Sequence, residues 1–385
     1  MPETAPDSPL PRAILDAVHS PMHPLARQTL LAAIDAGWSD PRRLHREGRT
    51  ARRLLDQARE ILASAMGLRP DEVSFHASAP HALDRGIRGL REGRRRVGNA
   101  LVTTAIDQAL VLRRRHDDDP LIVVDEHGHM DLGAFTQGVA SPGVALAVLA
   151  HANPEIGTRQ SIPEAHEAGR AAGVPLLLDV ASSWGRLPLP STAEVYAGDA
   201  ASFAGPPLGV LGVRTGTRFT LDGPPSGPEG GRELAEPWVP LALAAAEAWR
   251  QCEVDHRTDA ARARELIDRV RASAGQVPEV QVVGDPIERL PHVVTFSALY
   301  VDGEALVHEF DRRGFAVASG SACTADTLEP SHVLAGIGAI THGNVRLTLP
   351  MESVAPARSE WIDRFCVELP EVISTVRARL GTDRL

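Results

Sequence analysis

The sequence predicts an α/β fold, with a large domain built on a parallel sheet and a small α+β domain at the C-terminal end. Three observations support this prediction. Short β-rich runs alternate with helical stretches up to residue 214. Residues 222–233 are rich in Gly and Pro, which is typical of a loop. Beyond this loop, a long helical pattern is followed by a second series of short strands and helices.

In the large domain, a helix is expected over about residues 50–66, where Gly67 can end it. The expected strands are residues 73–76, 99–104, 121–125, 144–151, 174–179, 202–203 and 210–214. Because strands and helices alternate, we expect parallel neighbours with helices on both faces of the sheet.

The small domain follows a helix that we expect over about residues 238–273. Residues 292–349 show the pattern strand, helix, strand, helix, strand, and a last helix is expected over about 357–380. We therefore divide the chain into a mobile N-terminus (1–12), a large domain (13–255) and a small C-terminal domain (256–385). The N-terminal segment is expected to pack on the small domain.

Composition argues for a soluble protein that does not bind nucleic acid directly. The formal net charge is −10, whereas nucleic-acid binders are typically basic. We find no signal peptide and no apolar run long enough to cross a membrane. Three cysteines in 385 residues favour a reducing compartment, so we expect the cytoplasm.

Lysine is absent from the sequence, and all 40 basic residues are arginine. A codon bias toward arginine explains most missing lysines. Arginine cannot replace a lysine whose amine is needed for catalysis, because arginine stays protonated and forms no stable imine.

The sharpest local motif is Ala-Ser-Gly-Ser-Ala-Cys-Thr at residues 318–324, where small residues surround Cys323. Such a segment suits an exposed loop that presents a reactive thiol. It equally suits a buried turn with an inert cysteine, and local composition does not decide between the two.

The motif resembles the cysteine loop of bacterial housekeeping cysteine desulfurases, members of the class-V aminotransferase family of fold-type I pyridoxal phosphate (PLP) enzymes. Further matches follow in order, including His-Ala-Asn-Pro-Glu-Ile-Gly-Thr-Arg-Gln at 151–160 and Val-Arg-Leu at 345–347. The resemblance implies a fold-type I architecture and a homo- or heterodimer. It implies that Cys323 carries a persulfide, that Asp179 pairs with the PLP pyridine nitrogen and that Arg346 binds the substrate carboxylate. Asn153 is a further candidate pocket residue.

The departures from the family fall where PLP would bind. The family's lysine segment has no counterpart in residues 199–210, where it looks deleted rather than substituted. The phosphate-binding turn is Ser-Ala-Pro at 78–80, and Pro80 lacks a backbone donor. Gln108 replaces the histidine that stacks on the cofactor, and Ser182 replaces the glutamine at its phenolic oxygen. A Schiff base is impossible, and we expect no bound cofactor; Asp179 would be vestigial, and Gln108 and Ser182 would line the old pocket.

The histidines and cysteines do not have the sequence spacing of a known metal-binding motif, so no metal site is expected. His127 and His129 lie in a turn-like stretch, and His76 and His81 are five residues apart without a zinc motif.

Three hypotheses for function remain open. The leading one is a PLP-less pseudoenzyme in sulfur transfer, which accepts a persulfide on Cys323 or acts as the partner of an active cysteine desulfurase or a sulfur-acceptor protein. The second is an active lyase or desulfurase that binds PLP non-covalently, or another small ligand, in the old pocket. The third is a purely structural subunit.

Overall fold

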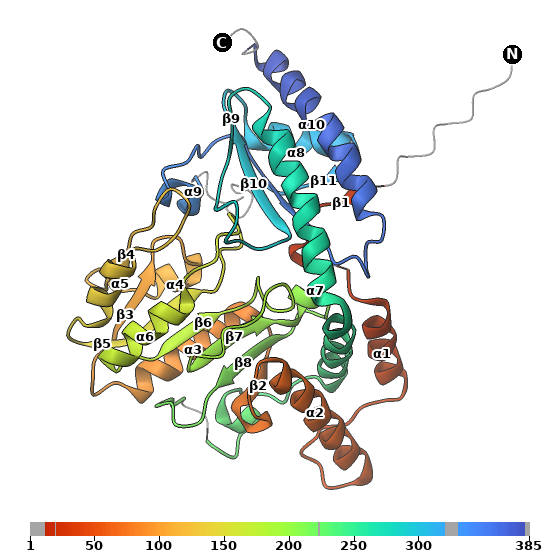
Figure 1. Ribbon diagram of the computed structural model, residues 1–385. Coiled ribbons are helices and arrows are strands. Elements are labelled where there is room, and N and C mark those ends of the chain that lie inside the picture. The colour runs from red at the N-terminus through yellow and green to blue at the C-terminus, as the bar shows by residue number, and fades with distance from the viewer. Residues whose placement is uncertain (1–11, 20, 222–223, 320–329, 382–385) are drawn as a thin grey trace, which may run out of the picture.

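The computed structural model describes residues 12–19, 21–221, 224–319 and 330–381, and its main feature is a seven-stranded sheet (Figure 1). The strand order is β2-β8-β7-β6-β5-β3-β4. The strands are β2 (Val73–His76), β3 (Ala100–Thr104), β4 (Leu121–Ile122), β5 (Val144–Ala150), β6 (Leu176–Asp179), β7 (Val195–Asp199) and β8 (Gly209–Val213). The predicted α/β class is confirmed.

The sheet is mixed rather than fully parallel. The ladders that join β3 to β4 and β5, β5 to β6, and β6 to β7 are parallel, whereas β8 runs antiparallel to both β7 and β2. Only residues 200–208 connect β7 to β8. A connection this short leaves no room for a crossover helix, so the two strands become antiparallel neighbours.

Helices cover both faces of the sheet, as the sequence predicts. On one face, α3 (Ala79–Gly93) buries Leu83 and Ile87 against Leu177. On the other, Leu178 belongs to the core shared with α2 (Arg46–Ala65), α5 (Leu132–Val139), α6 (Ile162–Ala172) and α7 (Val239–Gly275). Successive side chains of a strand point to opposite faces, so Leu177 and Leu178 serve different cores.

Most predicted elements lie within a few residues of the observed ones, with one clear error. Residues 202–203, expected as a strand, belong to the 3-10 helix Ala200–Phe203. The strand itself is β7, which the sequence analysis missed. The strand mixes strand formers with small residues, in Val-Tyr-Ala-Gly-Asp, so it gives a weak β signal.

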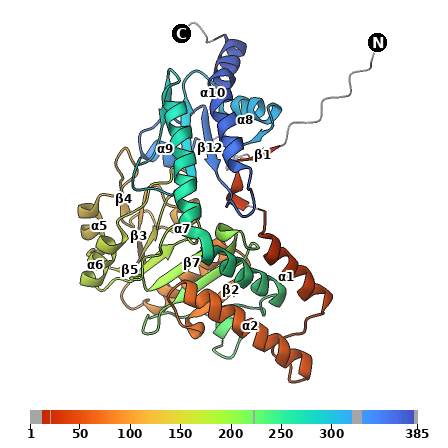
Figure 2. The same cartoon turned by 45° about the vertical axis from the view of Figure 1, so that its right-hand side comes forward.

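A smaller three-stranded sheet, in the order β12-β10-β9, forms the other part of the molecule. Its strands are β9 (Val280–Val282), β10 (Val293–Ala298) and β12 (Asn344–Thr348), and its helices include α8 (Gly303–Arg312), α9 (His332–Gly336) and α10 (Arg358–Leu380). The N-terminal β1 (Ala13–Ile14) pairs in parallel with β11 (Phe315–Ala316). The long helix α7 runs along both parts, and α1 (Pro24–Asp35) packs beside its first half (Figures 1 and 2).

The parallel strands of the large sheet end at one edge. Gly209 on β8 lies between two strand ends, with His76 of β2 on one side and Asp199 of β7 on the other. On the next strand, Asp179 at the end of β6 lies opposite Ala197 of β7. The carboxyl edge of a parallel sheet is where α/β proteins usually bind ligands. The predicted pocket residues of the large domain lie along this edge.

Candidate functional site at the carboxyl edge of the sheet

Asp179 ends β6 with its carboxylate buried at this edge. Its Oδ1 accepts a hydrogen bond of 2.9 Å from the Ala181 amide, and its Oδ2 accepts one from Nε2 of Gln108. Burial raises the pKa of Asp179 to about 6, and the nearby Asp107 and Asp199 add to the rise. The structure therefore brings two predicted pocket residues together, around a carboxyl group that titrates close to neutrality.

Asp107 is the anchor that positions Gln108. Its Oδ2 accepts hydrogen bonds from the Thr103 hydroxyl and from the amide and hydroxyl of Thr104, at 2.7–2.9 Å. Its Oδ1 accepts the Ala150 amide at 2.8 Å. Burial raises the pKa of Asp107, although these donors act in the opposite direction. The carboxylate thus joins the loop after β3 to the end of β5.

Asn153 shapes the loop after β5. Its side-chain oxygen accepts the amides of Glu155 and Ile156 at 2.9 and 3.1 Å, and its Nδ2 donates to the Ile106 carbonyl at 2.8 Å. The amide is therefore bonded to backbone groups on two loops. As placed, Asn153 fixes the edge of the site rather than presenting free hydrogen-bonding groups to a ligand.

His151 precedes this loop and is buried. Its Nδ1 lies 2.9 Å from the hydroxyl of Ser183, and burial lowers the pKa of the imidazole to about 4. The ring is therefore neutral over the physiological range, and it connects the end of β5 to the turn after β6.

Ser182 and Arg346 lie near this edge without joining the Asp179–Gln108 pair. Ser182 is half-buried in the turn three residues after Asp179. Arg346 lies on β12 opposite Thr295, whose hydroxyl donates to the Glu155 carbonyl at 2.6 Å. The small sheet therefore meets the large one beside the loop that Asn153 shapes.

Two polar atoms in this region are buried without a hydrogen-bond partner among the described residues. They are Nε of Arg346 and Oε1 of Glu155. Buried polar groups are nearly always paired, so an unpaired one needs an explanation such as a ligand.

Cys323 lies outside the described residues, in the segment 320–329. The residues on either side of that segment are anchored at the site. Before it, Ala318 pairs with Arg346 through two backbone hydrogen bonds of 3.1 and 2.7 Å. After it, Nε2 of His332 lies 2.9 Å from the Asp107 carbonyl.

The first turn of α3, where the sequence analysis expected a degraded phosphate-binding turn, has no free backbone donor. The Ala79 amide donates to Oδ2 of Asp199 at 3.3 Å, and the His81 amide donates to the hydroxyl of Ser78 at 3.3 Å. Pro80 has no N–H group. The N-terminus of a helix normally attracts anions, but here the carboxylate of Asp199 already lies there and accepts the Ala79 amide. As it stands, the turn does not fit a phosphate group.

The segment after β7, where the family's lysine has no counterpart, is a turn held by its own backbone hydrogen bonds. The Ala200 amide donates to the Leu208 carbonyl at 3.0 Å, and the Gly205 amide donates to the Ala200 carbonyl at 2.8 Å. Gly209 then packs so closely on Ser78 that an added Cβ would overlap the Ser78 carbonyl. Residues 204–208 are Ala-Gly-Pro-Pro-Leu and carry no amine that could form an imine.

Sequence reasoning missed two charged residues at this edge. Asp199 was read only as a flank of the missing lysine segment, and Glu233 was placed in a loop. Asp199 bonds a residue 120 positions away and Glu233 one 157 positions away, so local sequence carries no signal for either contact.

The family model for class-V aminotransferases matches residues 35–203 and 212–354. Among curated relatives, a cysteine desulfurase of Cereibacter sphaeroides is 30% identical over 377 residues, covering 92% of this chain and 94% of its own. The cysteine desulfurase IscS of Dictyoglomus turgidum is 25% identical over 347 residues, covering 86% of this chain and 88% of its own.

Solved structures show the same fold. A NifS-like protein has a TM-score of 0.83 at 19% identity, covering 94% of this chain and 100% of its own. The apo cysteine desulfurase of Thermococcus onnurineus has a TM-score of 0.79 at 20% identity, covering 94% and 95%. No helix of the described residues is long and apolar enough to cross a membrane. With a family model that matches most of its length, the chain belongs to the class-V aminotransferase family, among the cysteine desulfurases.

Proposed function

We propose that this family member works in sulfur transfer without lysine-bound PLP. It accepts a persulfide on Cys323, or serves as the partner of an active cysteine desulfurase. The observation that carries the proposal is the first turn of α3, in which Asp199 and Ser78 take the amides that would otherwise face a phosphate group.

Two further observations support the loss of the cofactor. Asp179, which in the family would face a protonated pyridine nitrogen, is hydrogen-bonded by Gln108 and the Ala181 amide instead. The family-model match is interrupted at residues 204–211, which overlap the second half of the segment between β7 and β8. A lysine aldimine has no residue on which to form, because the sequence contains no lysine.

The transfer step needs only a reactive thiol and a persulfide donor. The Cys323 thiolate attacks the terminal sulfur of the donor persulfide, the donor S–S bond breaks, and the donor cysteine leaves as a thiolate. A new S–S bond forms on Cys323, so one such bond replaces another and no oxidant is required. A second thiolate can then take the terminal sulfur in the same way.

The other two cysteines are poorly suited to this step and serve as internal controls. Burial raises the pKa of the Cys252 thiol to about 12, and burial also raises the pKa of Cys366. A thiol reacts through its thiolate, so both are expected to be inert near neutral pH.

The test combines the purified protein with a catalytic amount of an active cysteine desulfurase and isotopically labelled cysteine. After the thiols are trapped by alkylation, peptide mass spectrometry locates the labelled sulfur. We expect it on Cys323, unchanged in Cys366→Ser and lost in Cys323→Ser. If the label is absent from Cys323, the relay role is refuted.

The same Cys323→Ser variant distinguishes a relay from a structural partner. Mixed with the active desulfurase, a scaffold would keep its effect on sulfur delivery after the substitution, whereas a relay would lose it.

We expect the protein to act as a homo- or heterodimer in the cytoplasm, with the domain boundary near residue 255.

A second candidate function rests on the unpaired atoms Arg346 Nε and Glu155 Oε1. They favour a small polar ligand in the old pocket, and hence an enzyme of the lyase type. This candidate predicts release of sulfide or alanine from cysteine by the purified protein with added PLP, with loss of that activity in Arg346→Ala. The relay proposal predicts no turnover.

A further inference from the structure

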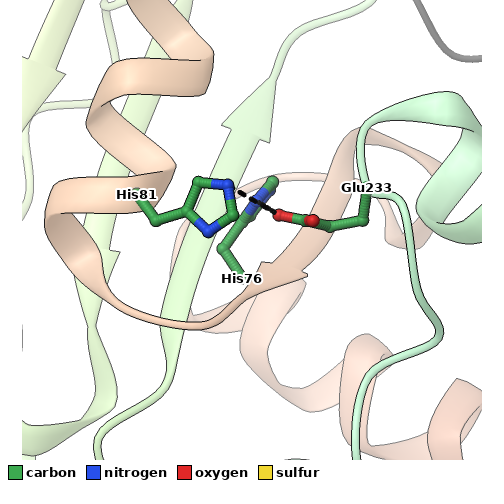
Figure 3. A group of neighbouring side chains, drawn as sticks. All are labelled: His76, His81 and Glu233. Carbon is green, nitrogen blue, oxygen red and sulfur yellow. Dashed lines mark hydrogen bonds and ion pairs between the residues drawn. The ribbon is translucent and has the colours of Figure 1, made fainter.

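Three metal-binding side chains converge beside the first turn of α3: His76, His81 and Glu233 (Figure 3). Oε1 of Glu233 lies 2.5 Å from Nδ1 of His76 and 3.4 Å from Nε2 of His81. One ligand atom from each of the three lies within 4.8 Å of the other two. They come from the end of β2, the start of α3 and the loop before α7, so the fold assembles the group from distant segments.

The His76 ring is held in the orientation that metal ligands use. The ring is fully buried, and its Nε2 lies 2.9 Å from the hydroxyl of Ser74. Ser74 can donate its own proton to the Leu211 carbonyl at 3.3 Å, which leaves its oxygen to accept from Nε2–H. A metal-bound histidine usually donates its other ring N–H to such a partner, which turns the free lone pair toward the ion.

In this tautomer the Nδ1 lone pair of His76 faces the carboxylate of Glu233. The 2.5 Å contact is a hydrogen bond when Nδ1 carries the ring proton, and a bound cation would take the place of that proton while Nε2–H donates to Ser74.

The loop that carries Glu233 is anchored independently of the two histidines. Glu229 forms two ion-paired hydrogen bonds with Arg59, at 2.6 and 2.7 Å, and accepts the Phe75 amide at 2.6 Å. Arg85 donates to the Arg232 carbonyl at 3.0 Å, one residue before Glu233. The Glu233 carboxylate is therefore brought to the end of β2 by side-chain contacts that do not require the His76–Glu233 pair.

The distances fit a zinc-like ion after a small adjustment. Bonds of about 2.0–2.2 Å to nitrogen and oxygen place tetrahedral ligand atoms roughly 3.3 Å apart. The His81–Glu233 separation of 3.4 Å already matches, and the His76–Glu233 separation of 2.5 Å would have to open by about 0.8 Å. His81 is 39% exposed, which leaves one side of the group open to water.

We propose that Nδ1 of His76, Nε2 of His81 and a carboxylate oxygen of Glu233 bind one divalent d-block cation, with zinc the best match. Two imidazoles and one carboxylate suit this class of ion better than calcium or magnesium, which prefer all-oxygen sites. Water takes the fourth position on the exposed side. The sequence analysis expected no metal, since Glu233 is remote in sequence from both histidines.

The site lies on the same edge as Asp179 but at the other end. β2 and β6 are three strands apart in the sheet, which corresponds to about 14 Å. The inference therefore does not depend on sulfur transfer, nor on whether the pocket near Asp179 binds anything.

Isothermal titration of the full-length protein with Zn²⁺, after removal of metals by a chelator, tests the proposal. We expect one zinc per chain, and a loss of affinity of at least about 100-fold in His81→Ala and in Glu233→Gln. Ser74→Ala should weaken binding by about 10–100-fold, because it removes only the group that orients His76. Parallel titration of Cys323→Ser separates this site from binding by the thiol.

His166→Ala provides a matched control. His166 forms a similar pair with Glu194, at 3.0 Å, but no second histidine is grouped with it. This variant should bind zinc like the wild type. The proposal is overturned if no stoichiometric site is found, or if His81→Ala and Glu233→Gln bind as tightly as His166→Ala. In that case His76 and Glu233 form an ordinary hydrogen-bonded pair.

Discussion

The two ends of the sheet edge differ in how their polar groups are satisfied. At the β6 end, Asp179 is buried with two hydrogen bonds and no ion pair among the described residues, and burial raises its pKa to about 6. At the β2 end, Asp199 and Ser78 take the backbone donors of α3, and Glu233 faces two imidazoles. One end holds a buried carboxyl group, whereas at the other end side chains of the chain itself take the backbone donors.

The comparison shows that groups of the chain itself can satisfy the buried polar positions at both ends of this edge. Gln108 donates to Asp179, and Asp199 supplies an anion at the N-terminus of α3. Because burying unpaired polar groups is costly, these contacts stabilise the sheet edge.

The largest effect is expected at the β2 end, in Glu229→Ala. The carboxylate is 1% exposed and paired with Arg59, so its removal leaves a partly buried guanidinium and the Phe75 amide without their acceptor. We expect a loss of about 3–5 kcal/mol in the free energy of unfolding, measured by urea denaturation. The zinc affinity should fall as well, because the loop that carries Glu233 loses its anchor.

The control for this prediction is Glu167→Ala. Glu167 pairs with Arg170 on the exposed surface of α6, with both side chains more than half exposed. Surface pairs contribute little, so a change below about 0.5 kcal/mol is expected. If the two variants lose similar stability, the β2 end is not held by its buried ion pair.

The next effect is a pH dependence at the β6 end, tested by Asp179→Asn. The pKa of about 6 in the folded protein lies above the ordinary value of 3.8, so the folded state binds the proton more tightly. Stability from this group is therefore present at low pH and is lost as pH rises through about 6. Asparagine removes the titration, and the Gln108 amide can turn over to match it.

The difference in unfolding free energy between Asp179→Asn and the wild type should therefore shift by about 1.4 kcal/mol in favour of the variant between pH 5 and pH 8. Urea titrations of both proteins at the two pH values measure it. His151 is present in both proteins, so its own titration cancels in the difference. An equal difference at both pH values would show that Asp179 is not the titrating group.

The smallest effect is expected for Ser78→Ala, which removes the N-cap of α3. We expect a loss of about 1 kcal/mol, and a loss of only a few tenths of a kcal/mol for Ser78→Gly, as is usual for helix caps. Freeing the His81 amide should not create phosphate binding, because Asp199 and Pro80 remain. Saturable binding of inorganic phosphate by Ser78→Ala would contradict the account of a filled turn.

Much of the fold could be predicted from periodicity and turn signals. The strand β2 and the long helix α7 were placed within one or two residues, because their apolar patterns are strong. The reversed direction of β8 and the strand β7 were missed. Direction depends on which strands pair, and β7 mixes Val and Tyr with Ala, Gly and Asp, so it gives no clear strand pattern.

The family resemblance named Asp179, Gln108 and Asn153 as candidate pocket residues, and in the structure Gln108 donates a hydrogen bond to Asp179. The role of Asn153 differs, because its amide bonds to loop backbone. The partners Asp199 and Glu233 could not be predicted, since their contacts depend on the folded sheet. Cys323 stays a prediction.

The central claim is that this cysteine desulfurase fold does not carry PLP as a covalent cofactor. The most direct measurement incubates the purified protein with PLP, reduces it with borohydride, denatures it, and determines the PLP that stays attached by mass spectrometry, with cysteine turnover assayed in parallel. The account predicts no specific adduct and no sulfide or alanine from cysteine. One PLP per chain fixed to a single residue, together with turnover of cysteine, would contradict it.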